Sequence, residues 1–269
     1  TIARRRPEPS LPSHDMDDLA LARTAALAAA EIIVGWRDRI DGADYKGTVD
    51  PVTVADREAE AAIAALIAEH RPADGLLAEE GAAATSTSGR RWVVDPLDGT
   101  VNFLHGVPQV AVSIALEDAD GVVIGVVRDA FRGEEFVAVR GAGATLNEAP
   151  ITVSKCTELR RALVSTGFSY DHQTRAAEYT RPFTAVLKVT QGIRRNGSAA
   201  LDLAWVACGR FDGHWEFNLS PWDVAAGFLL VREAGGTVRG FNGPADHRAF
   251  TAATPGIASA LHEVVASAR

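Results

Sequence analysis

The sequence contains little cysteine, and this limits the kinds of site it can build. Cys156 and Cys208 are the only two cysteines in 269 residues, and they form no metal-binding or redox motif. Both lie in apolar stretches of sequence. We therefore expect them to be reduced thiols of the core, which is typical of a cytoplasmic protein.

A net positive charge is also missing. The chain has 27 Lys and Arg against 35 Asp and Glu, which gives a net charge of −8. This balance argues against a general nucleic-acid binder, which normally carries a basic footprint. A composition of 47% hydrophobic and 23% charged residues is ordinary for a globular protein. The length allows one large domain or two closely packed halves.

The beginning of the chain lacks a long hydrophobic run. Residues 1–15 contain arginines and prolines without an apolar stretch, so we expect a disordered arm rather than a secretory signal. The apolar segment 19–35 is interrupted by Arg23 and Glu31, which favours an amphipathic helix that is too polar to span a membrane. These features predict a cytoplasmic protein that binds neither nucleic acid nor a membrane.

Residues 92–103 carry the most functional information. Asp95 and Asp98 place two carboxylates close together after an apolar segment, and such a pair repels unless a cation lies between them. Mg²⁺ commonly binds through one or two carboxylates and a substrate phosphate. If Gly99 and Thr100 open a helix, their N–H groups can receive an anion. Two aspartates alone also fit a solvated turn, but the combination predicts a metal-dependent phosphate site.

The complete string Trp92-Val-Val-Asp-Pro-Leu-Asp-Gly-Thr-Val-Asn-Phe103 closely resembles the signature of the inositol monophosphatase family. The resemblance implies that Asp95, the carbonyl of Leu97 and Asp98 bind Mg²⁺. It also implies that the backbone of Gly99 and Thr100 receives the phosphate. Two or three Mg²⁺ ions per site and inhibition by lithium follow from the same resemblance.

An earlier segment, Lys46–Asp56, matches the same family. Thr53 followed by Asp56 before an apolar-periodic stretch is the pattern of a helix capping box. By resemblance, Asp56 also approaches the metal cluster and hydrogen-bonds Thr100.

The segment Leu76–Gly81 matches as well, and it ends in an acidic pair. Such a pair can be the surface end of a strand. In the family the first glutamate binds metal and helps to deprotonate a water, so Glu79 is the predicted ligand and general base and Glu80 an auxiliary residue.

Ser220–Gly227 is the last match; its Pro and Asp are ordinary helix-start residues. The resemblance adds a metal ligand, Asp223, beside Trp222, for which we expect a core position.

Substrate choice is predicted to lie in the second half of the chain. Gly197–Leu203 resembles bacterial and archaeal inositol monophosphatases; it lacks the Lys of relatives that act on adenosine bisphosphates, and the Trp-Gly-Asp of histidinol-phosphate phosphatases is missing. Glu216 matches the residue that hydrogen-bonds an inositol hydroxyl, although an exposed strand position is equally compatible with the sequence. Ser198, Ala199 and Asp98 complete the predicted substrate pocket.

The predicted reaction is hydrolysis of inositol 1-phosphate by a metal-activated water, with Glu79, Thr100 and Asp56 as the catalytic residues. No Ser-His-Asp or Cys-His nucleophile is evident, so we expect no phosphoenzyme. Fructose 1,6-bisphosphate is the nearest alternative substrate, followed by other sugar phosphates or histidinol phosphate. A role as an interaction protein of the transcription machinery is the alternative from another class. By resemblance, we expect a homodimer.

Helix and strand patterns alternate along the chain, which fits α/β layers. The resemblance implies a layered α-β-α-β-α sandwich, which we divide into a metal- and phosphate-binding half, residues 16–150, and a substrate-binding half, residues 151–269. We expect helices over 17–37, 54–69, 174–190, 197–208, 223–235 and 254–268. Strands are expected over 91–95, 110–117, 121–130, 134–140, 151–153, 161–166, 211–217 and 237–240.

Overall fold

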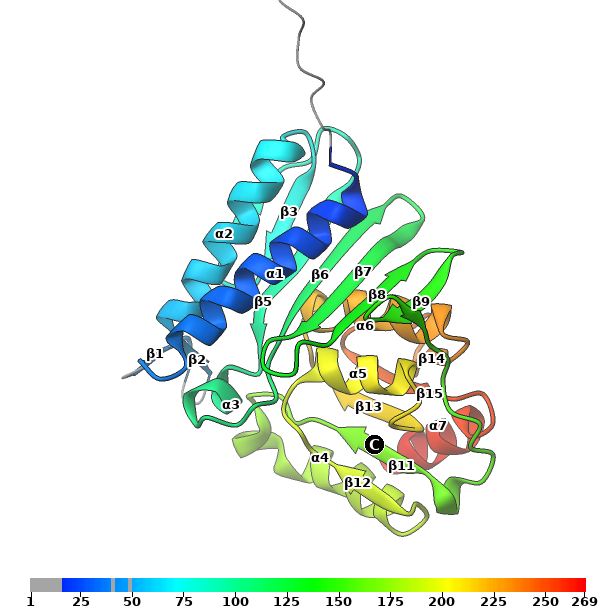
Figure 1. Cartoon of the computed structure of the whole chain (residues 1–269). Helices are drawn as coiled ribbons and strands as arrows, with labels where there is room; N and C mark the ends of the chain where they lie inside the picture. Colours follow the sequence, from blue (N-terminus) through cyan, green and yellow to red (C-terminus); the bar gives the residue numbers. More distant parts are fainter. Residues whose placement is uncertain (1–15, 40–41, 48–49) are drawn as a thin grey trace, which may run out of the picture.

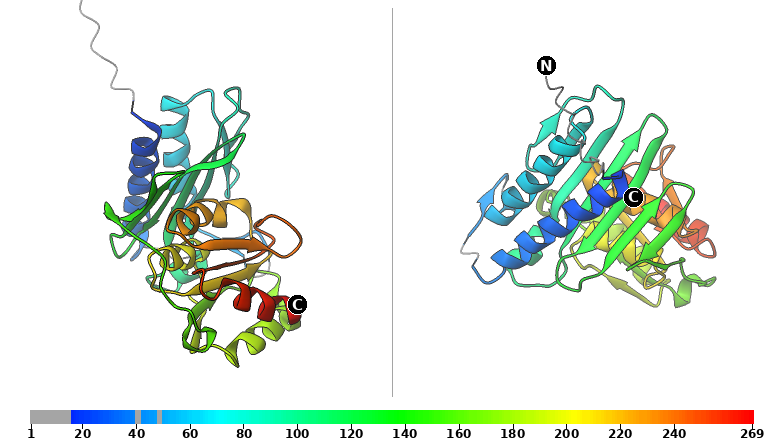
Figure 2. Two further views of the ribbon diagram at one scale, coloured as in Figure 1. Left: turned by 90° about the vertical axis from the view of Figure 1, so that its right-hand side faces the viewer. Right: turned by 45° about the horizontal axis from the view of Figure 1, so that its top comes forward.

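The computed structural model describes residues 16–39, 42–47 and 50–269, so the predicted arm of residues 1–15 lies outside the described residues. Three pairs of helices and two sheets form five layers (Figures 1 and 2). The outer pair on the large sheet is α1 (Asp18–Trp36) and α2 (Val54–His70). The central pair, between the sheets, is α5 (Ala199–Ala207) and α6 (Pro221–Glu233). The last pair, α4 (His172–Leu187) and α7 (Ala258–Ser267), covers the small sheet. The predicted α-β-α-β-α sandwich is confirmed.

The large sheet is built from residues before position 151. Its spatial order is β10 (Ala149–Pro150), β9 (Gly143–Leu146), β8 (Glu135–Val139), β7 (Gly121–Asp129), β6 (Ala111–Asp118), β5 (Arg91–Asp98), β3 (Gly75–Ala78) and β4 (Ala83–Ala84). Neighbours are antiparallel except for β3 and β5, which run parallel. The strand predicted over 151–153 is wrong, because the Val153 N–H donates to Ala234 at the end of α6 instead of continuing the sheet.

The small sheet uses the second part of the chain, in the order β12 (Gly192–Arg194), β11 (Leu163–Thr166), β13 (Gly213–Phe217), β15 (Ala249–Ala253) and β14 (Thr237–Gly240). β11 runs parallel to both β12 and β13. β15 has no counterpart among the strands expected from the sequence, and the last helix begins at Ala258 and not at 254. The short elements are β1 (Asp44–Tyr45), β2 (Pro51–Val52), α3 (Thr100–Leu104) and the 3₁₀ turn Leu159–Arg161.

Among the described residues, α1 is the one helix long and apolar enough to cross a membrane by length and composition, so the prediction that it is too polar for this is wrong. Its buried face, which includes Leu21 and Ile33, joins the apolar cluster under the large sheet. Arg23, which interrupts the apolar run, donates to Glu135 at 2.7 Å. In this structure α1 therefore packs as a core helix.

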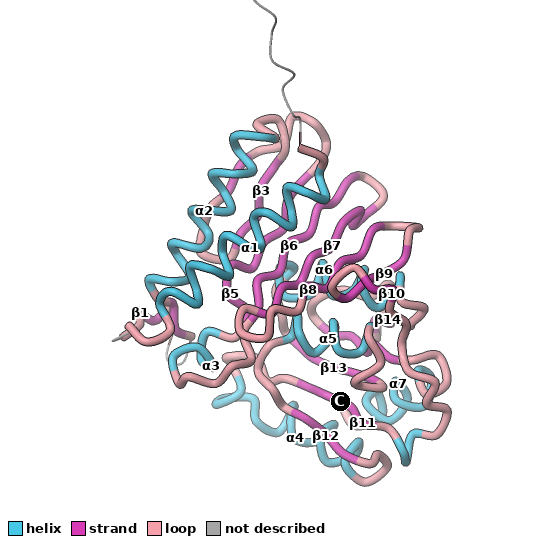
Figure 3. Tube along the Cα trace, in the orientation of Figure 1, coloured by secondary structure: helices cyan, strands magenta, loops and turns pink. Residues whose placement is uncertain are grey.

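Parallel strands bring their carboxyl ends to a common edge, and two such pairs determine where the cavity of this molecule lies. Glu79 directly follows β3, and Asp98 ends the parallel neighbour β5. In the small sheet, residues 167–170 follow β11 and residues 218–220 follow its parallel neighbour β13. These strand ends contribute residues to one cavity, on the side where α3 and α4 lie (Figure 3).

Candidate active site

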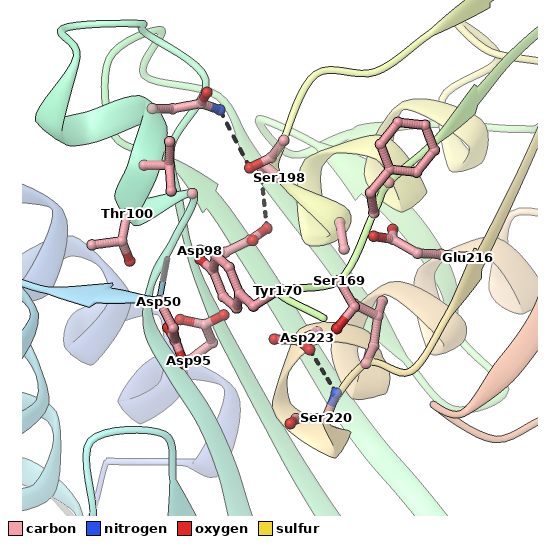
Figure 4. Close-up of a pocket in the computed structure, with 18 of the residues that line it drawn as sticks. Asp50, Asp95, Asp98, Thr100, Ser169, Tyr170, Ser198, Glu216, Ser220 and Asp223 are labelled. Atoms are coloured by element: carbon pink, nitrogen blue, oxygen red, sulfur yellow. Dashed lines mark hydrogen bonds between the residues drawn. The ribbon is translucent and has the colours of Figure 1, made fainter. Parts of the chain in front are cut away.

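A cavity of about 540 Å³ lies between the ends of the two sheets. Nearly all of the site residues predicted from the sequence line it, and they come from both parts of the chain: Glu79, Asp95, Leu97, Asp98, Gly99, Thr100, Ser198, Ala199, Glu216 and Asp223. Asp56 is the exception, because it is fully buried behind the cavity wall. Figure 4 shows Asp95 and Thr100 on one side of this space and Glu216 on the other.

The end of β5 explains how two carboxylates reach the cavity within four residues. The pairing of β5 with β6 is regular as far as Asp95 and then shifts register before Asp98, as expected where Pro96 cannot donate to the ladder. Asp95 accepts the Leu97 N–H at 3.0 Å, which closes the turn. Gly99 has φ +101°, and a Cβ there would lie 2.7 Å from the Gln109 carbonyl, so only glycine fits.

Asp56 supports this turn from behind. It forms the predicted capping box at the start of α2, where the Thr53 N–H donates to its carboxylate at 2.8 Å. Its other oxygen accepts the Thr100 hydroxyl at 3.0 Å, which is the contact implied by the family resemblance. Burial raises the pKa of Asp56, and the hydrogen bonds from Thr53 and Thr100 oppose that effect. Thr100 is thus held by a fixed acceptor.

The ammonium group of Lys46 forms ion pairs with both Glu79 and Glu80. The Lys46 Nζ lies 3.1 Å from Glu79 Oε1 and 2.6 Å from Glu80 Oε1. Burial raises the pKa of Glu79 to about 7, with Lys46 opposing and the charge of Glu80 adding to the effect. A carboxyl group with such a pKa can accept and release a proton near neutral pH, as a general base requires. Lys46 begins the family-like segment Lys46–Asp56, but no role was predicted for it from the sequence.

Three of the aspartates that line the cavity are the predicted metal ligands; Asp95 is buried, and Asp98 and Asp223 are half-buried. Asp98 accepts the Ser198 hydroxyl at 2.6 Å and the Ala200 N–H at 2.8 Å, and burial raises its pKa to about 6. Burial also raises the pKa of Asp95, and the charges of Glu79, Asp98 and Asp223 raise it further. Asp223 accepts the Ser220 N–H at 2.7 Å, and burial raises its pKa too.

This donor set fits a hard divalent cation. Within residues 16–39, 42–47 and 50–269, no three His, Cys, Asp or Glu side chains already converge as a metal-binding group. The chemistry nevertheless suits Mg²⁺, because buried carboxylates that raise one another's pKa are stabilised by a cation between them. Glu79, Asp95, Asp98 and Asp223, with the Leu97 carbonyl, are the groups that would hold it.

Several cavity residues have no role in the predictions from the sequence. Asp50 and Asp202 lie inside the family-like segments Lys46–Asp56 and Gly197–Leu203, whereas Ser169 and Tyr170 come from a segment without a recognisable pattern; all four line the cavity. Asn102 lies within the quoted signature, and its side chain donates to the carbonyls of Gln109 and Asn196, at 2.9 and 2.8 Å, so it ties the two parts of the chain together. Trp222, expected in the core, lines the cavity as well.

The structure also shows how far Glu216 and the two cysteines are buried. Glu216 is 5% exposed and lines the cavity, so the alternative of an exposed strand residue is wrong. Cys156 and Cys208 are free thiols, as expected, but they are half-buried at the edges of apolar clusters rather than in the core.

Comparison with known proteins finds relatives over most of the chain. The profile described as the inositol monophosphatase family matches residues 15–269. A protein of Synechocystis named inositol-1-monophosphatase is 45% identical over 227 residues, which cover 83% of this chain and 79% of the relative. A Pseudomonas aeruginosa protein named Nus factor SuhB is also 45% identical, over 84% of this chain and 86% of its own length.

A solved structure gives the same result. The inositol monophosphatase from Anabaena superposes with a TM-score of 0.84 at 38% identity, and the match covers 93% of this chain and 96% of that one. The match is therefore one of sequence as well as of fold, over nearly the whole chain. This chain belongs to the inositol monophosphatase family, a family of phosphatases.

Proposed function

We propose that this protein hydrolyses a phosphate monoester in the presence of Mg²⁺, and that inositol 1-phosphate is its substrate. One observation carries the proposal: carboxylates from both parts of the chain line a single cavity, and the wall facing them carries the buried Glu216. The names of the Synechocystis and Anabaena relatives support the choice of substrate.

Each group of residues has its own part in this reaction. A divalent cation at the carboxylate cluster would activate water and stabilise charge on the phosphoryl oxygens. Glu79, with a pKa of about 7, accepts a proton from the attacking water, which the Thr100 hydroxyl orients because Asp56 fixes it. Backbone N–H groups at Gly99 and Thr100 receive the phosphate. Glu216 accepts a hydroxyl of the alcohol part.

Phosphate release tests the proposal. Purified protein is assayed with inositol 1-phosphate, fructose 1,6-bisphosphate and histidinol phosphate, each with Mg²⁺, with excess chelator and with Mg²⁺ plus lithium. We expect the highest kcat/KM on inositol 1-phosphate, no turnover in chelator and inhibition by lithium. Full activity in chelator would refute the metal requirement, and a preference for either other phosphate would replace the substrate.

A second candidate function comes from the Pseudomonas aeruginosa relative, whose name, Nus factor SuhB, points to a role outside metabolism. The corresponding proposal is that this chain binds the transcription machinery. An absence of turnover on every phosphate tested, at saturating Mg²⁺, would favour this function over catalysis.

A further inference from the structure

A buried histidine lies directly behind Glu216, and the proposed reaction does not use it. His214 is fully buried on β13, two residues before Glu216 and on the same side of the strand. Its Nε2 atom lies 3.2 Å from Glu216 Oε2. Nε2 forms no hydrogen bond in the described part of the chain, and the Glu216 carboxylate is an acceptor within its reach.

The other ring nitrogen has a hydrogen-bond partner. Nδ1 is 2.9 Å from the Ser165 hydroxyl, on the parallel strand β11, and 3.8 Å from Asp202 Oδ2. A hydroxyl can donate as well as accept, so Nδ1 can accept from Ser165 and leave a ring proton on Nε2, where the Glu216 carboxylate is an acceptor within reach.

Gly167 confines the same carboxyl group from the other side. A Cβ added at Gly167 would lie 1.7 Å from Glu216 Oε1 and 2.6 Å from Oε2. The backbone φ of Gly167 is not in the left-handed region, so this residue is small in order to leave room for the carboxylate. His214 and Gly167 together fix Glu216 in a slot at the cavity wall.

We propose that His214 is a positioning residue for substrate recognition: through the chain Ser165–His214–Glu216 it holds the Glu216 carboxylate ready to accept a hydroxyl of the phosphorylated polyol. This inference rests on the proposed function, because it assigns the recognition of the alcohol part to that site. A flexible glutamate would lose side-chain entropy on binding, and a preoriented carboxylate avoids that cost. His214 touches neither the phosphate nor the metal-binding carboxylates.

Two variants of His214 separate positioning from general stability. His214→Phe keeps a ring but removes the hydrogen bond to Ser165 and the polar contact with Glu216, whereas Gln in His214→Gln can still present an N–H near the position of Nε2. We expect His214→Phe to lower kcat/KM on inositol 1-phosphate about tenfold, mostly through KM, and to change turnover of p-nitrophenyl phosphate less than twofold. His214→Gln should retain most of the activity on inositol 1-phosphate. Ser165→Ala gives a smaller loss with the same selectivity if His214→Phe fails to fold.

A double variant and a crystal structure complete the test. His214→Phe combined with Glu216→Gln should be no worse than Glu216→Gln alone, since both changes interrupt one interaction. The crystal structure of His214→Phe should show the carboxyl group displaced from Gly167. Equal losses on both substrates, additive losses, or an unmoved carboxyl group would overturn the proposal. If the wild type does not hydrolyse inositol 1-phosphate, the proposed substrate fails, and the crystal structure alone decides on His214.

Discussion

Single residues in this cavity are arranged for chemistry at the expense of stability. Asp95 is buried and Asp98 and Asp223 are half-buried beside it; the charges of Asp98 and Asp223 raise the pKa of Asp95, and the charge of Asp98 raises that of Asp223. Among the described residues around them, Lys46 forms ion pairs with Glu79 and Glu80 but not with these three aspartates. Without a bound cation, the repulsion within such a cluster destabilises the folded state. Removing one of its charges should therefore raise the stability of the metal-free protein and lower its activity.

The variant Asp95→Asn tests these opposite effects on stability and activity. The substitution keeps the shape and the acceptor for the Leu97 N–H but removes one of the repelling charges. We expect the metal-free protein to melt a few degrees higher, while phosphate release falls about a hundredfold or more because a ligand is lost. Asp118→Asn, at an exposed hairpin pair with Arg140, is the matched control and should change neither quantity. Near-normal turnover of Asp95→Asn would remove Asp95 from the ligand set.

Glu216→Gln tests the residue that is proposed to bind the alcohol part of the substrate. If Glu216 accepts a substrate hydroxyl, its loss should weaken kcat/KM on inositol 1-phosphate about tenfold to a hundredfold, since a charge-assisted hydrogen bond contributes roughly 1.5–3 kcal/mol. Turnover of p-nitrophenyl phosphate, which has no such hydroxyl, should stay within about twofold. A comparable loss on both substrates would assign Glu216 a purely structural role.

The sequence predicted the residues with a family pattern and missed those placed only by tertiary structure. Asp95, Asp98 and Thr100 lie within one short stretch, residues 95–100, so their grouping was readable directly. Ser165 and His214 lie 49 positions apart and meet only because β11 pairs with β13. No local spacing encodes that meeting.

At the scale of elements, the central helix α6 connects the two sheets. Its buried residues pack against the large sheet and against α5, and its first turn carries Asp223 into the cavity. The approach is close: a Cβ at Gly125, on β7, would lie 2.9 Å from Ala226 backbone atoms of α6. A glycine in a strand therefore sets the distance between a helix and a sheet.

Gly125→Ala should push α6 away from the sheet. Overpacking of this kind costs about 1–3 kcal/mol, which lowers the melting temperature of a chain this long by roughly 2–12 °C. Activity should fall as well, because Asp223 moves with the helix. Gly42→Ala, where a Cβ meets no atom within 4 Å, is the control and should leave melting and activity unchanged. A Gly125→Ala protein as stable and active as the wild type would show that the interface adapts.

Periodicity predicted the long elements and failed at short or alanine-rich ones. The strands β5 to β8 alternate or run apolar over several residues, and they were expected close to their observed limits. β15 reads Ala-Phe-Thr-Ala-Ala, which has little β-branched character, and it is a strand because it pairs with both β13 and β14. Its identity depends on partners that a local pattern cannot show.

At the scale of the whole molecule, the cavity couples folding to proton and metal binding. Carboxylates from the large-sheet part and Asp223 from α6 must come together for the site to exist. The unfolded chain has no such site, so any cation that binds there stabilises the folded state. Protons compete for the same carboxylates, so the stabilisation of the fold by a cation should depend on the pH.

Melting curves at two pH values test this coupling. In the metal-free folded protein the pKa values of Glu79 and Asp98 are about 7 and 6, above their usual values. The folded state therefore binds more protons than the unfolded chain, and this contribution to stability, complete below about pH 4, is lost as the pH rises to 7. Mg²⁺ should raise the melting temperature by about 5–10 °C at pH 8 when near a hundredfold above its Kd.

The same addition of Mg²⁺ at pH 5.5 should have a much smaller effect, because protons then occupy the carboxylates that the cation needs. Comparing each curve with its chelator control at the same pH cancels the titration of groups elsewhere in the chain. Asp95→Asn should reduce the Mg²⁺ effect at pH 8, which assigns that effect to this cavity. A stabilisation by Mg²⁺ of equal size at both pH values would mean that the cation binds elsewhere, and the carboxylate cluster would lose its role as the metal site.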